Sequence, residues 1–416
     1  MQRREFLLAS TFADGTLFSR TLAIGNMSKK RNIKSFGKTL AYLQDPNLRA
    51  TETGDARLIV DSMEITGESF EGKTWRNVSF KKCDFIGAYE VKLAAMENCT
   101  FEECRFSGIF AWGIQNAVSF IKCGMAGASH LWGAEGSTAV TYQQCTLTGT
   151  SADSNQQGSV GTYGEATFIE CNGKWFGVFG HSTLLIHKCE FDSMNCLIDP
   201  RESNGIAPDV AIRNCKLRGK FDMTSSVLQS LTVRDTVLEE LNLSNVTVKE
   251  DVVMERVKGN FIHAGVAAAR SLTVSNCEIL GNDRGVSFLM SMDGAQQVLL
   301  ERTNFGTQMT SKVNLGPGRP LQANEWSVVP LNKSAVIRNC TFPIMDASWL
   351  ETQRLQIEGN TIGSLNVSNG RMGKLELRSN TIARSVDFTN TQVKESNVQS
   401  FAKGQAKLEG SNIKLN

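Results

Sequence analysis

VSFKKCDF at residues 78–85 is one copy of a short pattern that returns along most of the chain. The pattern reads apolar, any, apolar, two polar residues, Cys or Asn, any, apolar. Two more copies are VAIRNCKL at 210–217 and LELRSNTI at 375–382. A fixed internal period is typical of a stack of similar turns, because each turn buries its apolar face only against the next. The sequence therefore predicts one elongated body.

A shorter period runs inside this repeat. Residues 231–248 read LTVRDTVLEELNLSNVTV, in which an apolar pair returns every five residues. Alternating side chains in short strands, with a corner every five residues, predict a four-sided coil that pairs with the coils above and below it. At ~4.8 Å per layer, fourteen coils imply a rod of about 65–70 Å. The landmarks of the fourteen coils are residues 83, 104, 123, 145, 171, 189, 215, 236, 257, 277, 303, 340, 360 and 380.

The stretch CTFEECRF at 99–106 resembles the pentapeptide-repeat proteins, whose fold is a right-handed quadrilateral parallel β-helix. That family prefers a small residue two positions before a central Leu or Phe, as at Cys104 and Phe106. Phrases such as IRNC at 337–340 also resemble the irregular right-handed β-helices of pectate-lyase-like and tailspike proteins. The resemblance implies an all-β, single-stranded, right-handed parallel β-helix of about fourteen coils with roughly 20 residues each, partly quadrilateral.

The rod is expected to occupy residues 58–392. Residues 1–57 precede the repeat, and we predict that they form a cap, because the end of a β-helix exposes unpaired strand edges. Residues 393–416 are predicted to be a last coil or a C-terminal cap. If a cap is weak, self-association through the coil ends is expected.

The eleven cysteines of the chain fall in one slot of the repeat, two residues before an apolar or small residue. Thr236 and Asn360 occupy the same slot elsewhere, so we interpret it as an inward position for a small side chain. A free Cys acts there as a small hydrophobe. No CxxC or CxxH pair occurs, and we expect neither disulfides nor a bound metal, and no cofactor.

Reduced cysteines favour a cytoplasmic location. Arg3–Leu8, which reads RREFLL, resembles a twin-arginine export signal and keeps export as an alternative. The apolar stretch that should follow is broken by Asp14 and Arg20, and no run approaches the ~20 apolar residues of a membrane span. Forty-four basic and 42 acidic residues leave a charge of +2, which disfavours a nucleic-acid partner.

An aromatic-glycine pair occupies the same part of four successive coils. Facing inward, these aromatic residues would fill the core; facing outward, they would form a strip suited to sugar rings or to a protein partner. His130 and His181 lie nearby in the sequence. The candidate binding residues are therefore Trp112, Trp132, Tyr163, Phe179, His130 and His181.

Coils longer than 20 residues mark four predicted loops along one side, at 148–162, 199–208, 281–295 and 306–333. A sugar-cleaving β-helix would need carboxylates, with Arg or Lys, on adjacent coils. The best such group is Asp199, Arg201 and Asp209, which we interpret as catalytic only if the protein is an enzyme.

The favoured interpretation is a non-enzymatic binding protein. Its loop-decorated side would bind a macromolecular partner, and a protein partner is favoured. An inhibitor, immunity or effector role fits this class. The alternative is a polysaccharide lyase or hydrolase, or a glycan-binding tailspike-like module. Exposed aromatic residues beside the carboxylates would favour the alternative.

Overall fold

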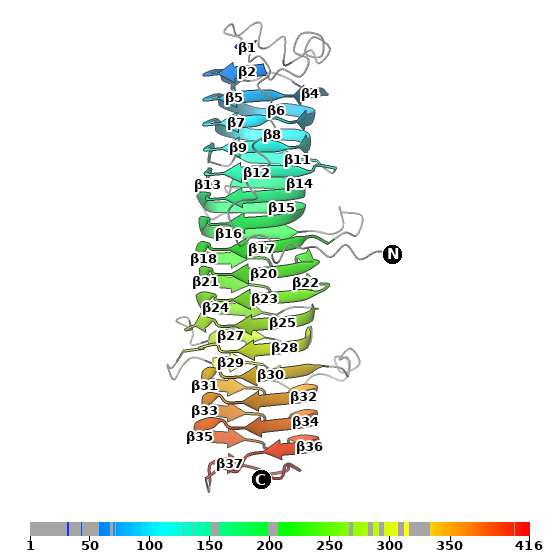
Figure 1. Cartoon of the computed structure of the whole chain (residues 1–416), viewed down its shortest axis with the longest axis vertical. Helices are drawn as coiled ribbons and strands as arrows, with labels where there is room; N and C mark the ends of the chain where they lie inside the picture. The colour runs from blue at the N-terminus through cyan, green and yellow to red at the C-terminus, as the bar shows by residue number, and fades with distance from the viewer. Residues whose placement is uncertain are drawn as a thin grey trace.

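The computed structural model of the chain is a rod of stacked strands, coloured from blue at one end to red at the other (Figure 1). Its strands pair in parallel with strands one repeat away along the chain. The chain is a parallel β-helix repeat protein. The structure describes residues 31–32, 43, 58–66, 70, 72–127, 129–134, 136–150, 158–198, 207–265, 269–281, 286–290, 295–306, 312–315, 333–402 and 404–416.

The described residues contain 37 strands. The first group is β1 (Arg31–Asn32), β2 (Leu58–Asp61), β3 (Glu64–Thr66), β4 (Lys73–Arg76), β5 (Val78–Lys81), β6 (Asp84–Glu97), β7 (Thr100–Glu102), β8 (Arg105–Asn116), β9 (Val118–Ile121), β10 (Gly124–Ala126), β11 (His130–Gly133), β12 (Ala139–Gln143), β13 (Thr146–Thr148), β14 (Gly158–Ile169), β15 (Asn172–His187) and β16 (Glu190–Ile198). The second group is β17 (Asp209–Arg213), β18 (Lys216–Asp222), β19 (Val227–Leu228), β20 (Ser230–Arg234), β21 (Val237–Asn242), β22 (Thr247–Val248), β23 (Asp251–Glu255), β24 (Lys258–Ala264), β25 (Ala269–Ser275), β26 (Glu278–Ile279), β27 (Val286–Met290), β28 (Ala295–Glu301) and β29 (Lys312–Asn314). The third group is β30 (Ser334–Arg338), β31 (Thr341–Asp346), β32 (Glu351–Glu358), β33 (Thr361–Asn366), β34 (Arg371–Arg378), β35 (Thr381–Asp387), β36 (Gln392–Val398) and β37 (Ala406–Lys407).

The strands form about 13 turns of roughly 21 residues. The fourteen sequence landmarks enclose thirteen intervals, so the predicted and observed stacks agree. The slot residues form one continuous column, because the residue after each slot donates its backbone N–H to the slot carbonyl one coil earlier. Arg105 bonds in this way to Cys83, and Thr381 bonds to Asn360 near the other end of the rod.

The two polar residues that precede each slot form a corner of the coil. The residue just before the slot has a positive φ, for example 51° at Lys82 and 55° at Asn339. This left-handed conformation turns the chain and directs the next side chain inward. The corner also leaves carbonyls that the slot side chain must satisfy.

The slot side chain is a hydrogen-bond donor to those carbonyls. The Cys145 thiol donates to the carbonyls of Gln143 at 3.4 Å and Phe120 at 3.3 Å. In other coils the hydroxyl of Thr236 or the amide of Asn360 donates to equivalent carbonyls. Most slot residues are therefore small donors, with Val257 as an exception, whereas size alone was predicted from the sequence.

Two of the eleven cysteines do not lie in the slot column, which corrects the prediction that all share it. Cys99 aligns with Val78 and Val118, because Thr100 pairs with Ser79 and with Ser119. Cys196 pairs with Val178 on the next side of the coil. All eleven thiols are buried.

The core is a set of side-chain columns that run along the rod. One column stacks five aromatic rings, with neighbouring centroids 4.7–4.9 Å apart, and then continues with aliphatic residues. The five rings belong to Phe80, Phe101, Phe120, Tyr142 and Phe168. Their planes differ by only 4–8°, so the register of the strands fixes the stacking.

A second kind of corner makes the later coils four-sided. The Asn242 side chain accepts a hydrogen bond from the backbone N–H of Ser244, and Asn366 accepts one from Ser368. Such Asx turns bend the chain at a corner, so that no helix or longer loop is needed there. Short strands such as β19 and β22 then form a separate side.

The long coils contain strands where loops were predicted. Gly158–Thr162 belongs to β14, and β27 and β29 lie inside the predicted loops at 281–295 and 306–333. These pieces pair with neighbouring coils because they keep the apolar alternation of a strand. The other residues of the four predicted loops lie largely outside the described ranges. Among the described residues, none forms a helix with the length and hydropathy of a membrane span.

Candidate functional site

The predicted aromatic ladder is split between the inside and the outside of the rod. Trp112 is 0% exposed, whereas Trp132 is 46% exposed. In the pairing of β8 with β11, Ala111 lies beside Trp132 and Gly113 beside Gly133. Trp112 is therefore the extra residue of a β-bulge and points to the opposite side of the sheet. Its burial in the core removes it from the predicted binding surface.

An apolar strip runs along the outside of consecutive coils. We define the apolar strip as Ala111, Trp132, Gly161, Phe179 and Leu197, which lie beside one another in β8, β11, β14, β15 and β16. Leu197 is 43% exposed and Phe179 is half-buried. Four layer steps of ~4.8 Å make the strip about 19 Å long. It presents aromatic and aliphatic side chains on a flat, rigid sheet.

Glycines form the floor under the two rings. A Cβ at Gly161 would lie 3.0 Å from Cδ1 of Trp132, and one at Gly177 would lie 2.6 Å from Cε2 of Phe179. The indole therefore lies across the next coil, and the phenyl ring lies back along its own strand. Because the rings rest on bare backbone, a larger side chain at either glycine would push them away from the sheet.

Hydrogen bonds hold Trp132 in this position. Its Nε1 donates to the Oγ of Ser159 at 3.2 Å, and the same Oγ lies 2.5 Å from Nδ1 of His130. The His130 and Trp132 rings are 5.5 Å apart. Burial lowers the pKa of His130, which favours the neutral ring that can accept from Ser159. The predicted binding residue His130 thus orients the exposed indole.

The other predicted binding residues are only partly placed. Tyr163 pairs with His181 where β14 meets β15. The side chains of both residues lie outside the described part of the structure. Their backbone positions follow the apolar strip on the same strands.

The predicted carboxylate group does not form a described catalytic cluster. Asp199 and Arg201 lie outside the described residues. Asp209 accepts a 2.5 Å hydrogen bond from Ser230 on the next coil. The same contact recurs two coils later, where Asp251 accepts one from Ser271 at 2.7 Å. Asp209 therefore belongs to a repeated polar contact of the scaffold.

Charged residues at the beginning of β15 and β16 are paired as well. Nζ of Lys174 lies 3.4 Å from Asp192 and 4.3 Å from the ring centre of Trp175. In the described ranges, no group of three or more His, Cys, Asp or Glu residues has an arrangement that could hold a metal ion. The site therefore offers shape and apolar surface and lacks a described acid-base pair.

Comparisons with known proteins find two solved structures of low similarity. No family model and no curated protein matches the chain. QnrB1, a plasmid-mediated fluoroquinolone resistance protein, has 12% identity and a TM-score of 0.15, over 74% of this chain and 89% of its own. The A-module of the Azotobacter vinelandii mannuronan C-5 epimerase AlgE6 has 11% identity and a TM-score of 0.25, over 89% of this chain and 94% of its own. At these values neither structure carries an argument about activity.

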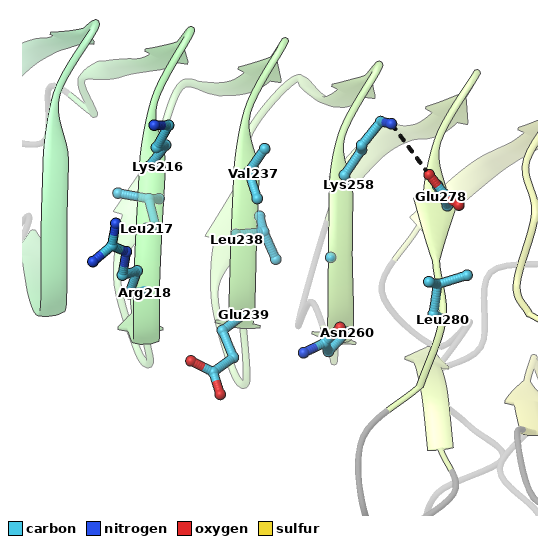
Figure 2. Close-up of a pocket in the computed structure, with 11 residues that line it drawn as sticks. Lys216, Leu217, Arg218, Val237, Leu238, Glu239, Lys258, Asn260, Glu278 and Leu280 are labelled. Carbon is cyan, nitrogen blue, oxygen red and sulfur yellow. Dashed lines mark ion pairs between the residues drawn. The ribbon is translucent and has the colours of Figure 1, made fainter.

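A groove lies farther along the rod, on the strands that follow the slot. Figure 2 shows two outward columns, with Lys216, Val237 and Lys258 in one and Arg218 and Glu239 in the other. The groove has a volume of about 370 Å³, and Val237 is 52% exposed. Its charges largely satisfy one another, for example Lys258 with Glu278 at 3.4 Å and Arg218 with Glu190 at 2.5 Å. The lining residues are Lys216, Leu217, Arg218, Val237, Leu238, Glu239, Lys258, Gly259, Asn260, Glu278 and Leu280.

Sequence reasoning missed Gly161 and Leu197 as parts of the strip, and Ser159 as the residue that holds Trp132. Leu197 follows Cys196, and alternation within β16 directs its side chain outward when Cys196 is buried. That signal was available from the sequence. Ser159 and Gly161 follow from the pairing of coils that are about 30 residues apart, so no local pattern marks them.

Proposed function

We propose that this chain is a non-enzymatic binding protein and that the apolar strip docks a protein partner. The observation that carries the proposal is the outward column of Trp132, Phe179 and Leu197, in which Trp132 and Leu197 are exposed and Phe179 is half-buried. Large exposed apolar groups in line are typical of interaction surfaces, since burying them in a complex is favourable. An inhibitor, immunity or effector-type role fits such a surface.

The composition of the strip favours a protein over a sugar. Leu197 has no ring face for stacking, but it fits an apolar side chain of a partner. Trp132 is held by Ser159 before binding, so less side-chain entropy is lost on docking. Buried aromatic anchors of this kind carry most of the energy in many interfaces.

The enzyme alternative lacks support at this strip. Acid-base cleavage of a glycosidic bond needs two carboxyl groups that converge on one bond. Asp192 is paired with Lys174, and Asp209 is bound to Ser230 on the scaffold. A glycan-binding role keeps one supporting observation, because the indole of Trp132 lies across Gly161 and half of it is open to solvent.

Affinity capture from the native cell tests the proposal, with the full chain as bait. The test variant carries Trp132→Ser and Leu197→Ser, and Val237→Ser in the groove is the matched control. We expect a captured protein to be retained by the control and weakened about thirty-fold or more by the double variant, as expected for loss of a ~2 kcal/mol anchor. Equal capture by both variants would refute the strip as the docking surface.

A glycan array distinguishes the alternative. Binding of an acidic polysaccharide by the wild-type chain that is lost in Trp132→Ala would move the assignment to a glycan-binding module. Turnover of that polysaccharide, abolished by Asp199→Ala, would move it to an enzyme. The protein-binding proposal expects neither binding nor turnover.

We further propose a cytoplasmic location and capped coil ends. The location rests on eleven free, buried thiols.

The cap rests on Asn412, whose amide accepts from the N–H of Val393 and donates to its carbonyl, at 2.9 and 2.8 Å. This side-chain amide stands in for the next strand at that edge. Fractionation of native cells and light scattering of Asn412→Asp test the two points.

A further inference from the structure

A column of cysteine thiols runs through the first part of the rod, and the proposed binding function makes no use of it. Seven slot residues in consecutive coils are cysteines. Their layers are joined by backbone hydrogen bonds of 2.9 Å, for example from Arg105 N to Cys83 O and from Lys216 N to Cys189 O. The thiol column consists of Cys83, Cys104, Cys123, Cys145, Cys171, Cys189 and Cys215.

The spacing of this column suits covalent pairing. Consecutive slot residues lie one layer apart, and a layer of ~4.8 Å falls within the roughly 4.4–6.8 Å that separates the Cα atoms of a disulfide. The slot side chains point inward from the same position of each coil, so the thiols of consecutive layers follow one another along the column. A bond between neighbours needs a side-chain rotation and a slight approach of the two strands, because a disulfide brings its Cβ atoms to roughly 3.5–4.5 Å.

The four remaining cysteines have no cysteine neighbour one layer away. Cys99 lies between Val78 and Val118, and Cys196 lies beside Val178. Cys277 and Cys340 are in the slot, but Thr303 separates them. Burial raises the pKa of Cys277 to about 11. These four thiols form an internal control set, because they are as buried as the thiols of the column.

We propose that the thiol column is an oxidation site, in which adjacent cysteines form disulfides that staple consecutive coils together. The oxidant is a small thiol-reactive molecule such as a hydroperoxide. One thiolate attacks the peroxide oxygen, which gives a sulfenic acid and an alcohol or water. The neighbouring thiol then displaces water from the sulfenic acid, and an S–S bond forms. Two S–H bonds are lost, and the peroxide takes up the two electrons.

Two features favour reaction at this column. Hydrogen bonds from the neighbouring thiols lower the pKa of Cys104 and of Cys171, so a thiolate forms there most easily. Each slot also follows directly after a surface corner, such as Lys82 or Lys188 with their positive φ. We expect a small oxidant to enter at these corners, because the slot is the first inward position after the surface.

The test is oxidation of the folded, full-length protein with diamide. Diamide is reduced to its hydrazine when two thiols form a disulfide. Free thiols are then counted by alkylation in denaturant, and the disulfides are mapped by mass spectrometry. Seven column thiols form three pairs and leave one. With the four isolated thiols, five of the eleven should remain free. The column thiols should be consumed at least ten-fold faster than Cys277 and Cys340.

Cys145→Ser sharpens the test, because it divides the column into two groups of three. Each group then supports one disulfide, so six of the ten remaining thiols should stay free. The matched control Cys340→Ser keeps three disulfides and leaves four free thiols. A serine hydroxyl fits either slot, since Thr236 and Thr303 already donate there to carbonyls. Eleven free thiols in the oxidised native protein, or the same count for both variants, would overturn the proposal.

Discussion

The rod has two regions that share one backbone plan and differ in what fills and covers it. In the thiol region, defined as the described residues from 70 to 217, cysteines fill the slot and aromatic rings stack in the core. In the amide region, residues 333–402, Asn360 and Asn380 fill most of the slot and the same core column is aliphatic. Exposed large hydrophobic side chains occur in the thiol region and are absent from residues 333–402.

The difference separates scaffold from surface. In the amide region the outside is covered by ion pairs, such as Arg354 with Glu376 at 2.8 Å, and each slot amide bonds to the next. In the thiol region the sheet is held by stacked rings and leaves Trp132 and Leu197 uncovered. A region whose interior carries its stability can leave apolar groups outside for a partner. The predictions below probe that contrast.

The largest effect is expected from the aromatic column. Phe120→Ala removes the ring between Phe101 and Tyr142 and should lower the free energy of unfolding by roughly 3–5 kcal/mol. Ile357→Val, in the same column of the amide region, should cost roughly 0.5–1.5 kcal/mol. Urea unfolding followed by circular dichroism measures both. Equal losses would mean that ring stacking does not distinguish the regions.

The second-largest loss of stability is expected for substitutions in the slot. Asn360→Ala removes the donor to the Ile337 carbonyl and the acceptor for the N–H of Cys340, which are both buried. Unpaired buried groups cost about 1–3 kcal/mol each. Cys145→Ala should cost less, because a thiol is a weak donor. Thermal unfolding of the two variants provides the comparison, and a larger loss for Cys145→Ala would contradict the account of the slot.

The ion pairs of the amide region predict a smaller, pH-dependent effect. Burial opposes ionisation of Glu376, but Arg354 and Lys374 outweigh it, so the pKa of Glu376 lies below its ordinary value. A lowered folded-state pKa stabilises the fold above about pH 4.5, and this stability is lost as the pH falls through the folded value. Glu376→Gln should flatten this acid limb in unfolding curves at pH 3–6. An unchanged limb would show that the contact contributes nothing.

The smallest effect on stability is expected at the strip. Trp132→Ala should change the free energy of unfolding by less than about 0.5 kcal/mol, because the ring is half exposed and rests on Gly161. Gly161→Val, by contrast, should expel the ring and increase its solvent quenching. Urea unfolding measures the free energy of unfolding of Trp132→Ala, and acrylamide quenching of tryptophan fluorescence measures the exposure of the ring in Gly161→Val. A large destabilisation by Trp132→Ala would assign the residue to the scaffold.

The fold was predictable from the sequence because its determinants are local and repeated. The slot, the polar corner and the alternation of apolar residues recur in each coil, so each copy reinforces the same register. The donor role of the slot was also visible in principle, since Cys, Thr or Asn occupies all of the fourteen landmark positions except Val257. What the sequence pattern could not show was the divergence of Cys99 and Cys196 from the slot column.

The strip was only half predictable, for a physical reason. Trp112 and Trp132 stand in the same local motif, but a single bulged residue in β8 puts them on opposite sides of the sheet. A bulge depends on the pairing between coils and leaves no local signature. Gly161 lies in register with Trp132 across a coil of irregular length. Spacing along the chain therefore did not place it.

Site-specific photo-crosslinking in the native cell tests the central claim most directly. A benzoyl-phenylalanine replaces Phe179 in the strip or Ser385, an exposed residue of β35 in the amide region. The account predicts a discrete crosslinked protein from position 179 that is lost when Trp132→Ser is added, and none from position 385. Crosslinks from position 385 alone, or from 179 regardless of Trp132, would contradict it.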